Sequence, residues 1–295
     1  MDGFVDGKGC PNKEYRGQMS IKCIALDLDR TTLNREGKLS AENRKALEEL
    51  IEKGVEVVIA SGRAYDTLPE EVTALPGIRY AVCGNGAAVY DLRSDNCIRR
   101  CLLSEEAVEA VLAATEKEMV CYEGIIEGVA YADREYVENP MKFNAQPQAV
   151  AYVQSTRRMR DDIVAFLREN KHRLDSIDII VRGEETKRRI WRRLEETVKG
   201  VYITSSVEQL LEIADEQAGK KAGVAFVADR LGLRREEIAA FGDADNDIDM
   251  LQYAGIGIAM ANASAGCRAA ADYITRHHAE DGVAYGVREI LKLLS

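Results

Sequence analysis

Two carboxylates stand two residues apart in the segment Asp27-Leu28-Asp29-Arg30-Thr31, directly after the apolar run Ile24-Ala25-Leu26. If the chain turns there, one carboxylate could attack a substrate or hold a metal while the other moves protons. Arg30 is the unusual member, because it places a long cation beside the acidic pair. Taken alone, the segment could also be a turn that caps a helix.

Polar residues also follow two other apolar runs. Ser61-Gly62-Arg63 comes after residues 55–60, and Gly242-Asp243-Ala244-Asp245-Asn246-Asp247 comes after residues 238–241. In open α/β sheets, ligands bind in the crevice beyond the carboxyl ends of the strands, so we expect the three polar clusters to share one crevice. Their carboxylate oxygens suit Mg²⁺, a hard cation held by a few carboxylates together with water and substrate phosphate.

Other metal and nucleotide motifs fit the sequence poorly. The segment from Gly242 starts like an EF-hand loop, but Ile248 stands where that loop needs Gly and Ala254 where it needs Glu. Residues 84–89 and 255–260 start like dinucleotide-binding fingerprints but lack the third Gly. The three histidines have no zinc-ligand spacing with a cysteine pair, so a zinc site is not expected.

Composition bounds the class of protein. With 295 residues, 46% of them hydrophobic and 31% charged, the chain is long enough for two globular domains. The net charge of -10 argues against a general binder of nucleic acid or anionic membranes, and no apolar run approaches the roughly 20 residues that span a bilayer. The seven cysteines are scattered without a CxxC pair, which predicts reduced thiols in a cytoplasmic protein.

The elements that must position the polar clusters follow from the apolar spacing. Residues 21–26 read as a buried strand, and Ser40 as the N-cap of a helix that runs to about Lys53. Strands at 55–60 and 80–83 follow, an order typical of a parallel α/β sheet.

The middle of the chain has a different texture, with frequent Tyr and Arg, and predicts an inserted α+β unit. We expect its helices at 104–117, 157–170 and 184–198 and its strands at 177–181 and 201–204. A helix at 220–231 and strands at 238–241, 256–260 and 272–275 would complete the first unit. Residues 1–18, rich in Gly, Lys, Asp and Asn, are expected to form a mobile tail, and translation could begin at Met19.

Four ordered motifs resemble those of the haloacid dehalogenase superfamily, and more narrowly its Cof-like phosphatases. They are Asp27-x-Asp29-x-Thr31, Ser61-Gly62-Arg63, Lys220 and Gly242-Asp243-x-x-Asn246-Asp247. The resemblance implies a Rossmann-like parallel-sheet core at 19–87 and 211–295 with an inserted α+β cap domain at 88–210. It also implies a Mg²⁺-dependent phosphatase of small phosphomonoesters, such as sugar phosphates, pyridoxal phosphate or flavin mononucleotide.

The resemblance implies a role for each motif residue. Asp27 would be the nucleophile that forms an aspartyl-phosphate, and Asp29 would act as acid and then as base. Lys220 would neutralise the charge of the phosphoryl group and of Asp27. The expected substrate-binding residues are Thr31, Ser61, Gly62, Arg63 and Asn246, and the expected metal ligands are Asp27, Asp243, Asp247 and, through its backbone carbonyl, Asp29.

Three positions leave alternatives open. Lys221 competes with Lys220, although the spacing along the predicted helix favours Lys220. Arg63 could bind a neighbouring carboxylate instead of substrate. Arg30 replaces the usual Gly of the first motif, and it could point to solvent or to a cap carboxylate, or lie near the substrate and select an additional negative group.

Two other functions fit the same motifs. A sugar phosphomutase of this superfamily would retain the phosphate and need a bisphosphate activator. A regulatory protein could bind a phosphorylated metabolite without hydrolysing it, a reading that only Arg30 favours. In each case the expected partner is a small phosphorylated metabolite rather than nucleic acid or a membrane, and no feature of the sequence indicates an oligomeric state.

Overall fold

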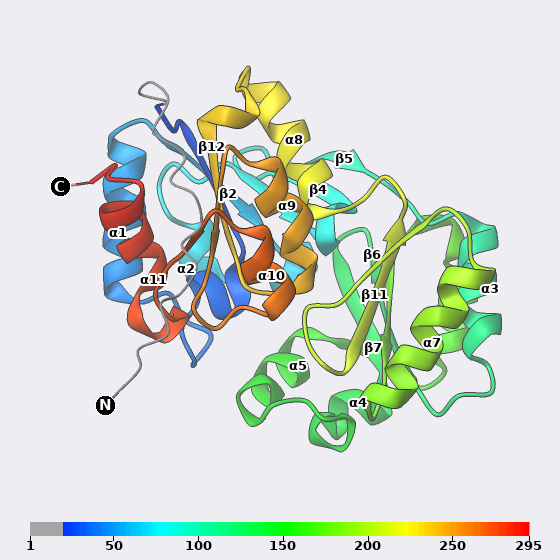
Figure 1. Ribbon diagram of the computed structural model, residues 1–295. Coiled ribbons are helices and arrows are strands. Elements are labelled where there is room, and N and C mark those ends of the chain that lie inside the picture. Colours follow the sequence, from blue (N-terminus) through cyan, green and yellow to red (C-terminus); the bar gives the residue numbers. More distant parts are fainter. Residues whose placement is uncertain (1–19, 295) are drawn as a thin grey trace, which may run out of the picture.

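The computed structural model of the protein describes residues 20–294, which form two sheets, each with its own helices (Figure 1). The predicted N-terminal tail and Met19 lie outside the described residues. The eight-stranded sheet has the order β14 (Tyr273–Ile274), β13 (Ile256–Ala259), β12 (Ile238–Gly242), β1 (Cys23–Leu26), β2 (Glu56–Ala60), β3 (Tyr80–Cys83), β4 (Ala88–Asp91) and β5 (Asn96–Arg100). Strands β14 to β3 are parallel, and β4 and β5 join antiparallel.

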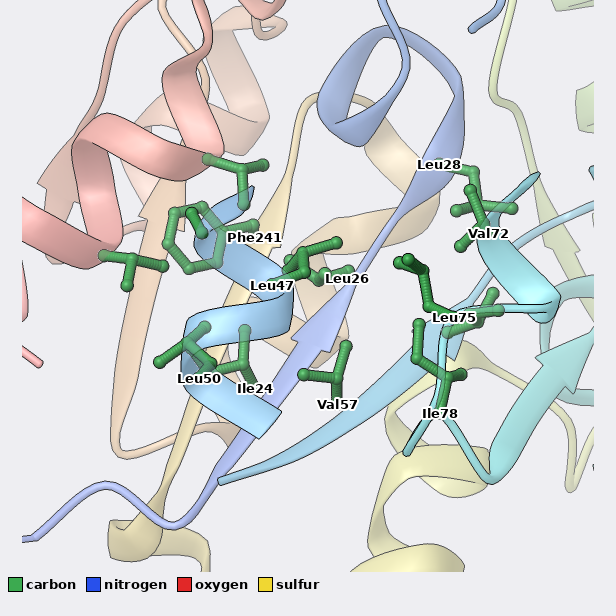
Figure 2. Close-up of a cluster of buried hydrophobic side chains, with 14 of the residues drawn as sticks. Ile24, Leu26, Leu28, Leu47, Leu50, Val57, Val72, Leu75, Ile78 and Phe241 are labelled. Atoms are coloured by element: carbon green, nitrogen blue, oxygen red, sulfur yellow. The ribbon is translucent and has the colours of Figure 1, made fainter. Parts of the chain in front are cut away.

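This sheet is buried on both faces, which explains why its central strands are apolar throughout. On one face, Ile24 and Leu26 of β1 lie in a cluster with Leu47 and Leu50 of α1 (Ala41–Glu52), as Figure 2 shows. On the other face, Cys23 and Ala25 pack toward the second helical layer. Helices α1, α2 (Glu70–Thr73) and α11 (Gly282–Tyr285) contribute to the first layer, and α8 (Lys220–Leu231), α9 (Ile248–Tyr253) and α10 (Ala265–Ala270) to the second (Figure 1).

Two helix termini form as their residue types predict. The Ser40 hydroxyl accepts a hydrogen bond from the Asn43 backbone N–H at 3.1 Å, so Ser40 is the N-cap of α1. Helix α8 spans the predicted residues and ends at Gly232, whose φ of +67° is a left-handed conformation that suits glycine. The first residue of α8 is Lys220, as the sequence predicts.

The six-stranded sheet has the order β10 (Val201–Thr204), β11 (Leu210–Asp215), β9 (Leu174–Ile180), β6 (Cys121–Ile126), β7 (Val129–Asp133) and β8 (Arg158–Arg160). Helices α3 (Glu105–Thr115), α6 (Ile163–Glu169) and α7 (Glu184–Thr197) pack on its apolar face, and Figure 1 shows α3 and α7 on the side away from the other sheet. Short helices α4 (Arg134–Glu138) and α5 (Val150–Thr156) lie at one end. We call this unit the cap and the eight-stranded unit the core.

The structure differs from the sequence-based expectations in two places. Strands β4 and β5 pair within the core sheet and β11 pairs within the cap sheet, so the chain changes sheets after Arg100 and Asp215, later than the predicted 87/88 and 210/211. The single helix predicted at 157–170 is wrong, because residues 158–160 add a strand beside β7 and α6 begins only at Ile163. Among residues 20–294, no helix has the length and apolar character needed to cross a membrane.

Candidate active site

Three carboxylates meet at the carboxyl ends of two neighbouring parallel strands. Asp27 directly follows β1, and its backbone N–H donates to the Phe241 carbonyl of β12 at 3.1 Å. Asp243 directly follows β12, and Asp247 lies one turn further along. Carboxylate oxygens of the three residues lie within 4.8 Å of one another, and each residue is at most 5% exposed. The structure therefore brings the first and fourth motifs together in one buried cluster.

Lys220 binds two members of this cluster from the start of α8. Its fully buried Nζ donates to Asp27 Oδ1 at 2.7 Å and to Asp247 Oδ1 at 2.6 Å. Burial lowers the pKa of this ammonium, but the two ion pairs outweigh burial and hold the pKa well above its ordinary value. Lys221 is exposed, so Lys220 is the lysine that reaches the centre.

The carboxylates differ in how many of their oxygens are engaged. Asp247 Oδ2 accepts the backbone N–H groups of Asp243 at 2.8 Å and Ala244 at 3.0 Å, so both Asp247 oxygens are occupied by the protein. Asp27 Oδ2 accepts no hydrogen bond from residues 20–294. Asp243 Oδ1 accepts the Thr31 hydroxyl at 3.2 Å, and Asp243 Oδ2 has only longer contacts, with the Asn262 amide at 3.4 Å and Arg30 Nε at 3.5 Å. Asp27 Oδ2 and the loosely held Asp243 Oδ2 are thus the oxygens most available to a ligand or cation.

Burial leaves this cluster in need of positive charge. Burial, followed by the charges of Asp27 and Asp247, raises the pKa of Asp243 to about 9. Burial also raises the pKa of Asp27 to about 7, although Lys220 opposes the shift. A cluster of hard oxygen donors with elevated carboxyl pKa values is the donor set that suits a divalent cation such as Mg²⁺.

The Asp29 carboxylate does not join this cluster as a fourth member. Its carboxylate forms a two-point ion pair with Arg63, from Nε at 2.8 Å and from Nη2 at 2.7 Å. Burial raises the pKa of Asp29, but the hydrogen bonds and charge of Arg63 outweigh it, so the pKa lies below its ordinary value. Arg63 therefore takes the alternative of binding a neighbouring carboxylate.

The cap holds Arg63 from the other side. The Arg63 guanidinium lies 4.1 Å from the ring centre of Tyr152 in α5, and the Tyr152 hydroxyl donates to Thr67 of the core at 3.1 Å. Arg157 stacks on the same ring at 4.5 Å and pairs with Glu123 of β6 at 2.9 Å. Sequence reasoning missed Tyr152 and Arg157, because Arg157 fell in the segment misread as a helix and neither residue belongs to a motif.

The second motif and Asn246 meet in a second buried network. Asn246 Nδ2 donates to Asn85 Oδ1 at 2.9 Å, and Asn85 Nδ2 donates to Glu212 Oε1 of the cap at 2.9 Å. A Cβ on Gly62 would come within 3.1 Å of Asn85 Oδ1 and 3.0 Å of Glu212 Oε1, which explains the glycine. Ser61 is buried beside this network, where its hydroxyl accepts the Arg63 N–H at 3.2 Å.

Asn85 and Glu212 are the polar partners that the motif residues alone do not reveal. Asn85 lies between two glycines directly after β3 and has a φ of +52°, a conformation that asparagine tolerates. A signal for Asn85 was therefore present in Gly84-Asn85-Gly86, at the end of a predicted strand. Glu212 lies in Leu211-Glu212-Ile213, a stretch that also resembles the family pattern, but the sequence does not indicate which residue it contacts.

Arg30 lies at the edge of the carboxylate cluster. Its Nε is 3.5 Å from Asp243 Oδ2, half of its side chain is exposed, and its backbone carbonyl accepts the Asn262 amide at 2.9 Å. Its φ of +60° is the left-handed conformation that the usual glycine would adopt without strain. Arg30 thus points toward the reactive centre rather than toward a cap carboxylate.

Comparisons with known proteins bear on the family and the fold. The sequence pattern of the haloacid dehalogenase-like hydrolases matches residues 24–287. Two similar curated proteins of Bacillus subtilis are 5-amino-6-(5-phospho-D-ribitylamino)uracil phosphatase YcsE, 30% identical over 92% of this chain and 97% of its own, and phosphatase YwpJ, 29% identical over 92% and 100%. A solved haloacid dehalogenase-like hydrolase from B. subtilis superposes with a TM-score of 0.79 at 28% identity, covering 91% of this chain and 99% of the other.

Proposed function

Since this chain belongs to the haloacid dehalogenase-like hydrolases and is a phosphatase, we propose that it hydrolyses small phosphomonoesters through an aspartyl-phosphate in a Mg²⁺-dependent reaction. The observation that carries the proposal is the buried cluster at the ends of β1 and β12. There, Lys220 holds Asp27 Oδ1 at 2.7 Å and leaves Oδ2 without a hydrogen bond from residues 20–294. A fixed carboxylate with one available oxygen is suited to nucleophilic attack.

The proposed reaction has two displacements. Asp27 Oδ2 forms a bond to phosphorus while the ester P–O bond breaks, and the departing oxygen takes a proton from Asp29. Asp29, now ionised, removes a proton from water, and the water oxygen attacks phosphorus. Inorganic phosphate then leaves and the Asp27 carboxylate is restored.

The ion pair with Arg63 bears on the proton transfers of Asp29. Arg63 favours the ionised carboxylate, which is the form that acts as base in the second displacement. Donating a proton in the first displacement requires Asp29 to turn away from Arg63. Arg63 is thus proposed to hold Asp29 in the basic state between the two displacements.

The residues proposed to hold Mg²⁺ are Asp27 and Asp243 through their carboxylates and Asp29 through its carbonyl. The sequence motif places Asp247 among the expected metal ligands. Because the protein engages both of its carboxylate oxygens, we propose instead that Asp247 positions Lys220 and the Asp243 backbone. When bound, the cation would offset the negative charges of the carboxylate and the phosphate. Thr31 would orient Asp243, and Ser61, Gly62 and Asn246 would bind phosphoryl oxygens.

The proposed substrates are small phosphorylated metabolites. Sugar phosphates, pyridoxal phosphate and flavin mononucleotide are the classes that the motifs imply, and the name of one relative adds 5-amino-6-(5-phospho-D-ribitylamino)uracil. We also propose a cytoplasmic location, which is supported by the burial of the thiols of Cys23, Cys83, Cys121 and Cys267.

The test measures phosphate release from p-nitrophenyl phosphate and from this metabolite panel, with Mg²⁺ and with chelator. Asp27→Asn should lower kcat by at least about a thousandfold, because the amide is a poor nucleophile. Asp229→Asn, an exposed substitution on α8, is the matched control and should leave kcat unchanged. Equal rates for wild type and Asp27→Asn would sink the proposal, and isomerised sugar phosphate without free phosphate would favour a mutase.

A further inference from the structure

A cavity of about 590 Å³ lies between the core and the cap, beside the carboxylate cluster. The core contributes Arg30, Asp243 and Asn262 to its wall, and the cap contributes the first two turns of α7 and residues 205–208. Asp243 belongs both to this wall and to the catalytic cluster. The organic part of a substrate whose phosphate lies at Asp27 would therefore extend into this space.

Lys187 places a buried ammonium group on the cap side of the cavity. It lies on the inward stripe of α7 with Ile190 and Leu194, and only 9% of it is exposed. Its Nζ donates to Ser205 Oγ at 2.5 Å and to the Val207 carbonyl at 2.9 Å. No carboxylate among residues 20–294 lies within 4.0 Å of it.

This arrangement leaves Lys187 incompletely satisfied. An ammonium group has three N–H donors, and only two of them have protein acceptors here. A buried cation without a counter-ion is costly, and burial lowers the pKa of Lys187. An anionic oxygen from a ligand in the cavity would supply both the missing acceptor and the missing charge.

Arg30 provides a second cation on the core side. Its left-handed backbone, with a φ of +60°, is strained relative to the glycine that usually occupies this motif position. The contact with Asp243 at 3.5 Å is loose, and that carboxylate is the one proposed to bind Mg²⁺. Residues with strained backbones are often found at functional sites, and Arg30 combines such a backbone with a cation at the edge of the cavity.

The other charged residues of the cavity wall leave these two cations available. Glu184 pairs with Arg188 on the surface of α7 at 3.4 Å. Asp245 accepts the Ser264 hydroxyl at 2.7 Å. Arg192 and Glu208 add one charge of each sign to the same wall, and the Glu208 carboxylate lies more than 4.0 Å from Lys187 Nζ.

We propose that this cavity binds a second anionic group, a phosphate or a carboxylate, on the organic part of the substrate, with Lys187 and Arg30 as its specificity-determining residues. The proposal rests on the proposed phosphatase function and narrows its substrates to phosphomonoesters that carry another anion. Sugar monophosphates without a second anionic group are expected to be weaker substrates.

The test compares matched substrates that differ in the second anion. Fructose 1,6-bisphosphate is paired with fructose 6-phosphate, and 3-phosphoglycerate with glycerol 3-phosphate, so the two pairs separate a phosphate from a carboxylate. We expect wild type to favour the doubly anionic member of at least one pair by about tenfold or more in kcat/KM, mainly through KM. Taking the ratio within a pair removes effects of a variant on metal binding or on the chemical steps.

Lys187→Gln separates charge recognition from a structural role. The glutamine amide can still donate to Ser205 and Val207, but it has no charge, so the preference should fall about tenfold. Arg30→Gly should lower the preference about threefold, because Arg30 is half exposed. Lys221→Gln, an exposed lysine on α8, is the control and should keep the wild-type ratio.

Equilibrium binding makes the inference independent of turnover. Binding of both members of each pair to the Asp27→Asn protein is measured by calorimetry. Equal binding of the two members, binding of neither, or a preference that Lys187→Gln retains would overturn the inference. If the protein hydrolyses p-nitrophenyl phosphate through Asp27 but shows no preference for doubly anionic substrates, the inference is overturned and the phosphatase function stands. If the protein binds doubly anionic substrates preferentially but releases phosphate from no ester, only the phosphatase function is overturned.

Discussion

Arg30 has a backbone conformation that few residues other than glycine adopt, and it lies next to a carboxylate that is proposed to hold a cation. A φ of +60° brings Cβ close to the following carbonyl oxygen, and the guanidinium competes with any metal for Asp243. Backbone strain and charge at one residue thus act on two different properties of the protein, its stability and its affinity for Mg²⁺.

Arg30→Gly should therefore tighten Mg²⁺ binding without lowering stability. We expect Mg²⁺ to bind about two- to fivefold more tightly, since an ion pair with a half-exposed partner is worth up to about 1 kcal/mol. The midpoint of thermal unfolding should stay the same or rise, because the strain is relieved while glycine adds flexibility to the unfolded chain. Titration calorimetry with Mg²⁺ and thermal unfolding measure the two effects.

Two further variants separate the causes. Arg30→Lys keeps a cation on a strained backbone and should resemble wild type in both measurements. Arg30→Asn removes the charge but tolerates the left-handed conformation, so it should tighten Mg²⁺ binding as the glycine does. Weaker Mg²⁺ binding by Arg30→Gly would contradict this account of the ion pair.

The residues of the candidate site could be predicted where a motif and a strand end coincide. The proximity of Asp27, Asp243 and Lys220 follows from their places after β1, after β12 and at the start of α8. The partner of Arg63 stayed open, because it depends on how a flexible side chain packs against Tyr152, which is 89 positions after Arg63 and 68 before Lys220.

At the scale of elements, the cap sheet carries three carboxylates in one row. Glu123 of β6 and Glu212 of β11 are directly opposite Asp178 of β9, on the face away from the apolar helices. Glu123 is paired with Arg157, and Glu212 accepts from Asn85, whereas Asp178 has no hydrogen-bond partner among residues 20–294. Burial, followed by Glu212 and Glu123, raises the pKa of Asp178 well above its ordinary value.

Asp178→Asn should stabilise the protein at neutral and alkaline pH. Because the pKa of Asp178 is higher in the folded than in the unfolded protein, its protonation stabilises the folded state. This stabilisation is complete below the unfolded pKa of about 4 and is lost as the pH rises through the folded pKa. The amide cannot ionise, so we expect a gain on the order of 1 kcal/mol, or a few degrees in Tm, at pH 8 and a smaller gain at pH 5. Thermal unfolding at the two pH values measures it.

Asp161→Asn is the matched control for this effect. Asp161 is exposed and paired with Arg134, which holds the pKa of Asp161 below its ordinary value. Its replacement should bring no gain at pH 8. A lower Tm for Asp178→Asn at pH 8 than for wild type would refute the electrostatic account of the row.

Elements could be predicted best where apolar spacing is regular. Ser40 at the start of α1 and Lys220–Leu231 in α8 follow the expected boundaries because capping residues mark them. Residues 157–170 do not follow the expected boundaries. Arg158–Arg160 forms a strand because it pairs with the edge strand β7. Pairing with a distant strand leaves no trace in local spacing.

At the scale of the whole molecule, one aromatic ring joins the cap to the catalytic residues. Tyr152 of α5 lies between two guanidinium groups, those of Arg63 in the core and Arg157 in the cap, and it also contacts Thr67. A cap that opens must break these contacts and uncover the ion pair between Arg63 and Asp29. The position of the cap is thus linked to the environment of the proposed acid and base.

Tyr152→Ala should shift the molecule toward an open cap. The cation–π contacts and the hydrogen bond together are worth about 1–3 kcal/mol, so the ratio of open to closed molecules should rise about tenfold. A larger radius of gyration by small-angle X-ray scattering is the expected result.

Tyr131→Ala is the comparison for the opening of the cap. Tyr131 also stacks on arginine side chains, Arg158 and Arg160, but its stacking partners all belong to the cap. Its loss should leave the radius of gyration unchanged. An unchanged radius for Tyr152→Ala would show that other contacts, such as the bond from Asn85 to Glu212, determine the closed state.

The contact made by the Arg99 guanidinium bears on how the cap can evolve. Arg99 lies in β5, just before the chain leaves the core sheet, and its guanidinium donates at 2.7 Å to the carbonyl of Gln217, just after the chain leaves the cap sheet. Because the two ends of the cap lie next to each other, a cap of different size can replace it without moving the flanking strands of the core sheet. The cap side of the substrate cavity can therefore evolve, or be engineered, while the strands that carry the carboxylate cluster keep their positions.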